Sequence, residues 1–497
     1  MKASISAGVA DLIQDALLVY ADDPAAAAAL EAYARRLSEP LRLAVAGMVK
    51  AGKSTLLNAI IGEEIAPTDT GECTKIVTWY RYGHTPRITA YPIAGEPHVL
   101  PLKRVGGRLV FVLGNARAED MERLVVEWPS PALRELTLID TPGIASLSED
   151  VSARSTDFLI PADAPSEADA IIYLMRHMHA SDLRFLESFR DTEAGRSGTV
   201  NALAVLSRAD EIGAGRIDSL LSAGDIADRY RRDHSLRKLA LGVVPVAGLL
   251  AQSARSMRQS DFESMQVLAG MERSARERML LSADRFIRAT VPQSLGAEAR
   301  TSLLERFGLF GIRLGVVLIR SGFTEPTPLA HELARRSGLD PLLHLVARQF
   351  QARGDALKAR TALVGVESLL RSAPREGAGH LAAALERLQA NAHEFRELRL
   401  LATIRTTGVS LSDELAAEAE MLVGGGGAAP ALRMGLAPDA GPDIVLAEAR
   451  RFLNRWRTVS ENPLTERSAV EACRVVMRSC EGVVAECSAL QLHPQSA

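Results

Sequence analysis

"LRLAVAGMVKAGKSTLLNAIIG", residues 41–62, joins an apolar run to a glycine-rich loop and then to a helical stretch. The loop fits the spacing Gly-x-x-x-x-Gly-Lys-Ser, in which backbone N–H groups turn inward toward phosphate oxygens. Within it, Lys53 should reach the β- and γ-phosphates, and Ser54 should ligate Mg²⁺. The loop and helix residues expected to bind a nucleotide are Gly47, Lys50, Ala51, Gly52, Lys53, Ser54 and Thr55.

Short apolar runs without polar alternation recur from residue 41 to residue 248. Such runs are typical of parallel strands that are covered on both faces, and helical stretches separate them. This alternation predicts a doubly wound, mostly parallel α/β sheet. Further short stretches with turn residues, between the first two runs, predict added antiparallel strands. The runs are "LRLAVAG" (41–47), "LTLID" (136–140), "AIIYLMR" (170–176), "NALAVLS" (201–207) and "GVVPVAG" (242–248).

The rest of the chain has apolar residues at helical spacing and few strand signals. We expect residues 1–38 to form two helices that join a helical bundle. We expect residues 39–335 to form the nucleotide-binding domain, and residues 336–497 an all-α, elongated bundle or stalk.

Composition narrows the class of protein. The 497-residue chain has a net charge of −3 and a pI near 6.4, which gives no bulk attraction to nucleic acid. The N-terminal stretch lacks the apolar core of a signal peptide, and no apolar run reaches the ~20 residues that span a bilayer. We therefore expect a cytoplasmic protein without a nucleic-acid partner, whose membrane contact, if any, is peripheral.

A second phosphate-side element is "LTLIDTPG", residues 136–143. Asp140 ends an apolar strand, a position from which a carboxylate holds Mg²⁺, here through water. Gly143 can offer its backbone N–H to the γ-phosphate. A nucleotide switch also needs a hydroxyl that meets Mg²⁺ only while the γ-phosphate is present. We expect Thr74 to supply it; the alternatives are Thr68, Thr70 and Thr78.

Base recognition is expected after the strand "NALAVLS", in "SRAD", residues 207–210. The Asp210 carboxylate can accept two hydrogen bonds from guanine, which adenine cannot match. Arg208 can lay its guanidinium plane on the base. The common GTPase pattern has Asn or Thr where this chain has Ser207, so an ordinary strand-to-helix turn and an ATPase both stay open as alternatives. Ala247 and Gly248 should contact guanine through their backbone.

These motifs together resemble those of bacterial dynamin-like proteins, members of the dynamin superfamily, and "ERFGLFGIR" (305–313) resembles the isoniazid-inducible type among them. The resemblance covers residues 40–250 by motif and the rest by architecture alone. The stretches that carry it are "KAGKSTLLNAIIG" (50–62), "CTKIVTWYRYG" (73–83), "EWPSPALRELTLIDTPGIAS" (127–146), "SRADEIG" (207–213) and "VVPVAGLL" (243–250).

The resemblance implies a GTPase domain and a helical neck or stalk with a lipid-contacting tip. It also implies Mg²⁺ as cofactor, GTP as substrate, and self-association through GTPase domains. The implied action is peripheral remodelling or maintenance of the membrane at its cytoplasmic face, with a related dynamin-like protein as a plausible partner. The alternative is a soluble GTP-binding switch or scaffold whose helical half docks a protein partner.

One departure concerns the third and fourth loop positions, where dynamin carries polar side chains that help catalysis. This chain has Val49 and Lys50 there. Valine cannot do that work. Lys50 can supply positive charge to the nucleotide of its own subunit or across a dimer, in the manner of an arginine finger. The alternative is a solvated lysine that the loop merely carries.

The glycine- and proline-rich stretch "GGGGAAPALRMGLAPDAGP", residues 424–442, interrupts the helical half. It is a candidate membrane tip, which could insert Leu432, Met434 and Leu436 and place Arg433 at a lipid headgroup. The alternatives are a disordered linker and rival tips in the connections "RSAPREG" (371–377) and "TIRTTGVSLS" (403–412).

Overall fold

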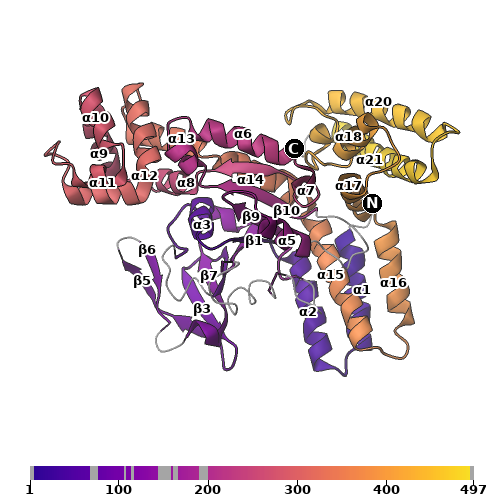
Figure 1. Ribbon diagram of the computed structural model, residues 1–497. Helices are drawn as coiled ribbons and strands as arrows, with labels where there is room; N and C mark the ends of the chain where they lie inside the picture. Colours follow the sequence, from indigo (N-terminus) through magenta and orange to yellow (C-terminus); the bar gives the residue numbers. More distant parts are fainter. Residues whose placement is uncertain are drawn as a thin grey trace.

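The computed structural model describes residues 5–67, 76–105, 108–113, 117–143, 158–159, 166–189 and 200–492. A large sheet lies at the centre, with a helical lobe on one side and two helical groups on the other (Figure 1). The predicted fold class, an α/β domain of the P-loop type joined to an all-α half, is confirmed.

The central sheet has nine strands in the order β11-β10-β9-β1-β8-β2-β7-β3-β4. The five strands from β11 to β8 run parallel, as the apolar runs predict, and β2 pairs antiparallel with β8. The added strands extend the sheet beyond β8, and β5 and β6 form a separate hairpin. The strand bounds are β1 Leu41–Gly47, β2 Val77–Tyr82, β3 Arg87–Pro92, β4 His98–Leu100, β5 Leu102–Val105, β6 Arg108–Phe111, β7 Met121–Trp128, β8 Leu136–Asp140, β9 Ala170–Met175, β10 Ala202–Ser207 and β11 Val243–Val246.

Helices cover both faces of the parallel strands, so alternate side chains of β1 enter different cores. Leu43 and Val45 share a core with α3 (Lys53–Ile61) and α14 (Leu339–Gln349). Ala44 and Ala46 pack on the other face, with α5 (Ala180–Ser188), α6 (Ser219–Arg232) and α7 (His234–Arg237). This two-sided burial explains the absence of polar alternation in the sequence.

α14 follows the domain boundary expected at residue 336, yet it packs on β11 and α3 of the sheet domain. Gly338 (φ +84°) makes the approach close, since a Cβ there would lie 2.1 Å from the Pro245 carbonyl oxygen.

A helical lobe follows β11 and has a hydrophobic core of its own. Its longest helix, α12, is bent at Gly308, where φ is 61° and ψ is 173°. The lobe comprises α8 Gly248–Arg255, α9 Gln259–Gly270, α10 Arg273–Met279, α11 Ala283–Arg288, α12 Ala297–Arg320 and α13 Pro326–Arg336.

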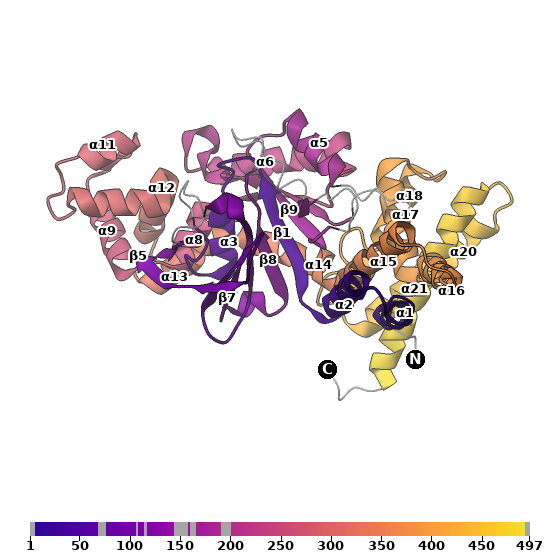
Figure 2. The same ribbon diagram turned by 90° about the horizontal axis from the view of Figure 1, so that it is seen from below.

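The first helical group on the other side contains both N-terminal helices (Figure 2). α1 (Ile5–Val19) and α2 (Pro24–Ser38) pack against α15 (Gly354–Ser372), and α1 also packs against α16 (Gly379–Asn391). We call these four helices the bundle. Gly365 allows α15 to approach α2 closely, because a Cβ there would lie 2.3 Å from the Tyr33 ring.

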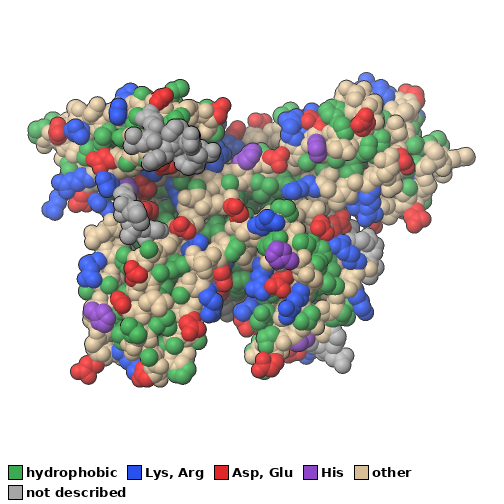
Figure 3. All heavy atoms as spheres, turned by 180° about the vertical axis from the view of Figure 1, so that it is seen from behind, with side chains coloured by type: hydrophobic (Ala, Val, Ile, Leu, Met, Phe, Trp, Pro, Cys, Tyr) green, Lys and Arg blue, Asp and Glu red, His purple; other side chains and the backbone are tan. Residues whose placement is uncertain are grey.

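A second helical group completes the chain, and its last helix, α21, buries the cysteines Cys473, Cys480 and Cys487. The remaining helices of this group are α17 His393–Thr406, α18 Asp413–Leu422, α19 Pro430–Arg433 and α20 Pro442–Glu461, and α21 spans Arg467–Leu492. Seen from behind, the lower half of the molecule divides into two separate parts (Figure 3). Basic and acidic side chains are interspersed over this face.

The expectation that residues 424–442 form a membrane tip is wrong. Met434 is only 2% exposed, and Leu436 packs against the main hydrophobic core. Leu432 packs over Gly427, where a Cβ would lie 2.7 Å from the Leu432 Cδ1 atom. The Arg433 side chain donates to the Leu422 carbonyl oxygen at 2.9 Å and pairs with Glu397.

The backbone conformations of three glycines explain why this segment is packed against the protein. Gly424, Gly427 and Gly435 have positive φ angles, which turn the segment back onto α17 and α18. Arg353 donates to the Gly424 carbonyl oxygen at 2.6 Å and fixes the turn. Among the described residues, none of the helices is long and apolar enough to cross a membrane.

Candidate nucleotide site

The glycine-rich loop leaves β1 at the carboxyl end of the sheet and leads directly into α3. Gly47 has φ +149°, and a Cβ there would lie 2.4 Å from the Leu174 carbonyl oxygen, so only glycine fits. Gly52 has φ +96°, and a Cβ added there would meet no atom within 4 Å. Between them, Lys50 takes a left-handed conformation with φ +63°, which is uncommon for a residue with a side chain.

Lys53 is the first residue of α3, and its side chain reaches back to the loop. Its Nζ atom donates to the carbonyl oxygens of Gly47, at 3.2 Å, and Met48, at 3.4 Å. Burial lowers the pKa of Lys53, and the nearby carboxylate of Asp140 opposes that shift. A partly buried cation at the N-terminal end of α3 is well placed to bind phosphate oxygens.

Ser54 and Asp140 meet beside the lysine, as the sequence predicts. The Ser54 hydroxyl donates to the Asp140 Oδ2 atom at 2.9 Å. The other carboxylate oxygen, Oδ1, is buried and has no hydrogen-bond partner among the described residues. Burial raises the pKa of Asp140 to about 6, against the opposing effect of Lys53.

Mg²⁺ fits this pair. The ion prefers oxygen ligands, and it keeps several waters when it is bound with substrate phosphates. A hydroxyl and a carboxylate with one unsatisfied oxygen supply a direct ligand and an acceptor for a metal-bound water.

Gly143 lies against the loop. A Cβ on Gly143 would be 2.6 Å from the Val49 Cγ2 atom, so a side chain there would push the segment away from the phosphates. The expected hydroxyl ligand, Thr74, lies outside the described residues, as do Thr68 and Thr70. Thr78 is buried in β2, and its hydroxyl already donates to the Ile76 carbonyl oxygen at 3.2 Å.

A pocket of about 180 Å³ continues from the loop on the side expected for the base. Asp210 lies in its wall, is 9% exposed, and has a pKa that burial raises above the usual range. The lining residues are Ala51, Gly52, Thr55, Leu56, Leu174, Val205, Ser207, Arg208, Asp210, Glu211, Val246, Gly248 and Leu249.

Arg208 connects the glycine-rich loop to the base-side loop of this site. Its guanidinium donates to the Lys50 carbonyl oxygen at 2.9 Å and to Glu211 at 2.6 Å. Ser207 is buried and donates to the Met175 carbonyl oxygen at 3.2 Å. The arginine that sequence reasoning assigned to the base therefore also fixes the left-handed turn at Lys50.

Gly248 lines the pocket as expected, but the expectation for Ala247 is wrong. Ala247 is fully buried, its N–H donates to the Ser337 carbonyl oxygen at 2.8 Å, and its own carbonyl accepts from Ala251. Both backbone groups are thus occupied by protein partners.

Sequence reasoning missed Glu211. It accepts from Arg208 and, at 2.8 Å, from Arg176, and so holds the base-side loop to the end of β9. The only sequence signal is an acidic residue three positions after an arginine, a spacing that favours an ion pair wherever it occurs in a helical turn.

Comparison with known proteins agrees with the motifs. The model of the Dynamin family matches residues 43–106. The isoniazid-induced protein IniC of Mycobacterium tuberculosis is 42% identical over 463 residues, which cover 93% of each chain. A bacterial dynamin-like protein of Nostoc punctiforme is 28% identical over 214 residues, 40% of this chain and 28% of that protein.

Among solved structures, one of an oligomerised bacterial dynamin pair aligns over 95% of this chain and 84% of that one, with 14% identity and a TM-score of 0.32. The family follows from the sequence relative that matches along nearly the whole length of both chains. The chain belongs to the bacterial dynamin-like proteins of the IniC type.

Proposed function

We propose that this protein is a Mg²⁺-dependent GTPase that converts GTP to GDP and phosphate. The observation that carries the proposal is the continuity of one site. The Ser54–Asp140 pair lies at the phosphate end, and the pocket walled by Asp210 lies at the base end of the same loop. Membership of the dynamin family supports the same activity.

In this proposal, Lys53 and the N–H groups of residues 47–55 bind the phosphates. Ser54 and Thr74 would hold Mg²⁺ directly and Asp140 would hold it through water, and the ion would supply positive charge at the phosphates. Thr74 and the N–H of Gly143 sense the γ-phosphate. None of the described side chains at the site is assigned as a general base, because positioning and electrostatics supply most of the catalysis in such sites.

Lys50 is proposed to supply the extra positive charge. Its backbone is held in the left-handed turn by Arg208, while the side chain is exposed beside the phosphate end of the loop. A side chain so placed can reach the nucleotide of its own subunit or that of a second copy paired through GTPase domains.

Guanine selection is proposed to rest on Asp210, with the Arg208 guanidinium plane on the face of the base and the Gly248 backbone in contact with it. Thermal unfolding with each nucleotide tests this part. GTP with Mg²⁺ should raise the melting temperature, and ATP should not. Equal protection by both nucleotides would count against Asp210 as the guanine reader.

We further propose that GTP turnover drives self-assembly and the peripheral remodelling or maintenance of the membrane at its cytoplasmic face. A paired dynamin-like protein is the proposed partner. The family relationship supports this membrane function.

A second candidate function is a soluble GTP-binding switch whose helical half docks a protein. It is favoured by the burial of Met434 and the packing of the partly buried Leu436 against the core, within the segment that would otherwise reach lipid. Co-sedimentation with anionic liposomes separates the two. Pelleting in the GTP-bound state supports membrane action, and its absence in every nucleotide state supports the switch.

A further inference from the structure

The base-side loop, residues 208–215, has a backbone conformation that few residues adopt. Four of its residues have positive φ angles between 52° and 68°, and two of the four, Arg208 and Ala214, are not glycines. Left-handed backbone persists at such residues only where the surrounding structure holds it. Asp210, the proposed guanine reader, lies within this loop and in the wall of the base pocket. The position of its carboxylate therefore depends on what anchors the loop.

Two anchors of the loop come from the sheet domain itself. Near its start, Glu211 accepts a hydrogen bond from Arg208 at 2.6 Å. Farther along, the Ser219 hydroxyl at the start of α6 donates to the Ile212 carbonyl oxygen at 2.6 Å. Neither of these contacts reaches the last residue of the loop, Gly215.

The third anchor comes from the helical lobe, 98 residues later in the chain. The Arg313 guanidinium of α12 donates to the Gly215 carbonyl oxygen and, at 2.5 Å, to the Leu280 carbonyl oxygen. A Cβ on Gly215 would lie 3.7 Å from the Arg313 Nη1 atom and 3.9 Å from the Phe310 Cβ atom. The end of the base-side loop therefore lies directly against α12.

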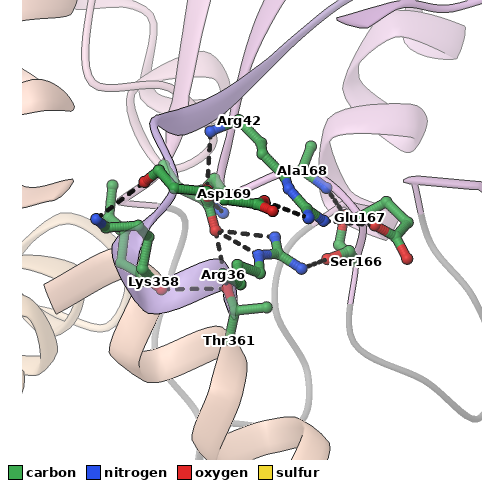
Figure 4. Close-up of polar contacts among 11 residues, drawn as sticks. Arg36, Arg42, Ser166, Glu167, Ala168, Asp169, Lys358 and Thr361 are labelled. Carbon is green, nitrogen blue, oxygen red and sulfur yellow. Dashed lines mark hydrogen bonds and ion pairs between the residues drawn. The ribbon is translucent and has the colours of Figure 1, made fainter. Parts of the chain in front are cut away.

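The partners of Arg313 differ from those of the buried arginine between the sheet and the bundle. There, Arg36 of α2 donates twice to the Asp169 carboxylate, at 2.8 and 3.1 Å, and once to the Ser166 carbonyl oxygen (Figure 4). Among the described residues, Arg313 has no carboxylate partner, and both of its acceptors are main-chain oxygens. A carboxylate can follow a moving arginine by rotating about its side-chain bonds, whereas a carbonyl oxygen moves only with its backbone. Arg313 therefore fixes the backbone at the end of the base-side loop.

The same stretch of α12 also packs beside another wall of the base pocket. α12 bends at Gly308, and a Cβ there would lie 3.6 Å from the Cδ2 atom of Leu249, which lines the pocket. The described lining residues include none from 305–313. The motif "ERFGLFGIR" (305–313) thus supports the pocket from outside, through the loop on one side and through α8 on the other.

We propose that Arg313 is a positioning residue for guanine recognition. It holds the base-side loop in the conformation that presents the Asp210 carboxylate to the base, and it does not touch the nucleotide. This role rests on the proposed GTPase function and makes part of the base selectivity of that site depend on the helical lobe.

Inosine triphosphate is the probe that tests this role, because it lacks the 2-amino group of GTP. A carboxylate that accepts hydrogen bonds from both N1 and N2 of guanine loses one of them with this substrate. The parent should therefore have a KM for inosine triphosphate about tenfold or more above its KM for GTP. Phosphate release by the full-length protein with Mg²⁺ gives KM and kcat for both substrates.

Arg313→Ala should raise the KM for GTP about tenfold or more while kcat stays within about threefold, because the phosphate side of the site is unchanged. The ratio of the two KM values should fall below about three, since a displaced carboxylate no longer distinguishes the two bases. Arg313→Lys keeps the charge and one donor group, so it should fold even where the alanine variant does not, and it should lower the ratio to a smaller extent.

Arg276→Ala is the matched control. Arg276 is 8% exposed and donates to the Met271 carbonyl oxygen at 2.8 Å, inside the same lobe and away from the base-side loop. This variant removes a buried arginine with a carbonyl partner, and it should keep the parent's ratio of KM values.

An unchanged ratio of KM values in both Arg313 variants overturns the inference. Loss of the ratio in Arg276→Ala as well would assign the effect to general loosening of the lobe, and would overturn it too. If the parent hydrolyses GTP and inosine triphosphate with equal KM values, Asp210 is not the guanine reader, and the role of Arg313 fails while the GTPase activity stands. A parent that hydrolyses neither substrate contradicts the GTPase proposal itself.

Discussion

Lys50 is the residue whose role the site leaves most open to experiment. Its left-handed backbone is fixed by the Arg208 contact, so a substitution changes the side chain more than the turn. Lys50→Ala should lower GTP turnover by about tenfold or more, as loss of a charge that acts in the transition state does, while GTP affinity stays within about threefold.

Steady-state turnover and equilibrium nucleotide binding check this prediction. Lys50→Arg is the control, because it keeps the charge and should retain most of the turnover. Unchanged turnover in Lys50→Ala would return Lys50 to a solvated lysine without a catalytic part.

Asp140 should make magnesium binding depend on pH. Its pKa of about 6 lies above the usual value of 3.8, so the folded protein without metal holds a proton on this carboxyl up to about pH 6. Mg²⁺ needs the ionised form, and its apparent affinity with bound nucleotide should fall about tenfold per pH unit below about 6 and level off above about 7.

Isothermal titration with Mg²⁺ between these pH values measures the slope. Asp140→Asn should bind Mg²⁺ more weakly and lose the protein's share of the pH dependence, leaving only that of the nucleotide phosphates.

The raised pKa of Asp140 also makes the stability of the folded protein depend on pH. Because the folded state binds this proton more tightly than the unfolded chain, the contribution of Asp140 to stability falls as pH rises from about 4 to about 6.

The residues on the phosphate side of the site could be assigned from the sequence because their positions depend on local spacing. Gly47, Lys53 and Ser54 lie within one loop, and Asp140 ends the strand beside it. Ala247 could not be assigned this way. Its N–H is taken by Ser337, which lies far along the chain and has no sequence pattern that links it to β11.

At the level of elements, the segment 424–442 shows how composition can mislead. Glycines and prolines predicted an exposed tip, yet positive φ angles turn the chain inward, where Glu397 and Arg353 reach it from α17 and the α14–α15 turn. Those partners are recognisable only once the helices are packed.

The packing of this segment can be tested through Met434. Met434→Ala should lower the free energy of unfolding by about 2–5 kcal/mol, as for a buried methionine, without changing liposome binding. Asp439→Ala, at an exposed position of the same segment, should change it by less than about 0.5 kcal/mol. Denaturant unfolding checks both. A stable Met434→Ala variant that no longer pellets with liposomes would restore the tip interpretation.

The contact between α14 and the sheet domain can be tested at Gly338. Gly338→Ala should destabilise the protein by more than about 1 kcal/mol, because the backbone is left-handed and the new methyl group meets the Pro245 carbonyl. Gly322→Ala, also at a positive φ but with open space around it, measures the backbone effect alone. Equal losses in the two variants would show that α14 does not pack closely on β11.

At the scale of the whole molecule, the sequence predicted the fold class well and the arrangement of the helices less well. Strand runs with two-sided burial determine a doubly wound sheet almost by themselves. The lobe with α12 bent at Gly308 and the two helical groups arise from long-range packing, such as α15 against α2 at Gly365, which periodicity does not encode.

Whether this chain is a GTPase of the dynamin type is tested by phosphate release from GTP and from ATP, with and without Mg²⁺, over a range of protein concentrations. We predict that GTP alone is hydrolysed, that Mg²⁺ is required, and that turnover per molecule rises with protein concentration as GTPase domains pair. Equal hydrolysis of ATP, or no hydrolysis of GTP by the folded protein at any concentration, would contradict the account.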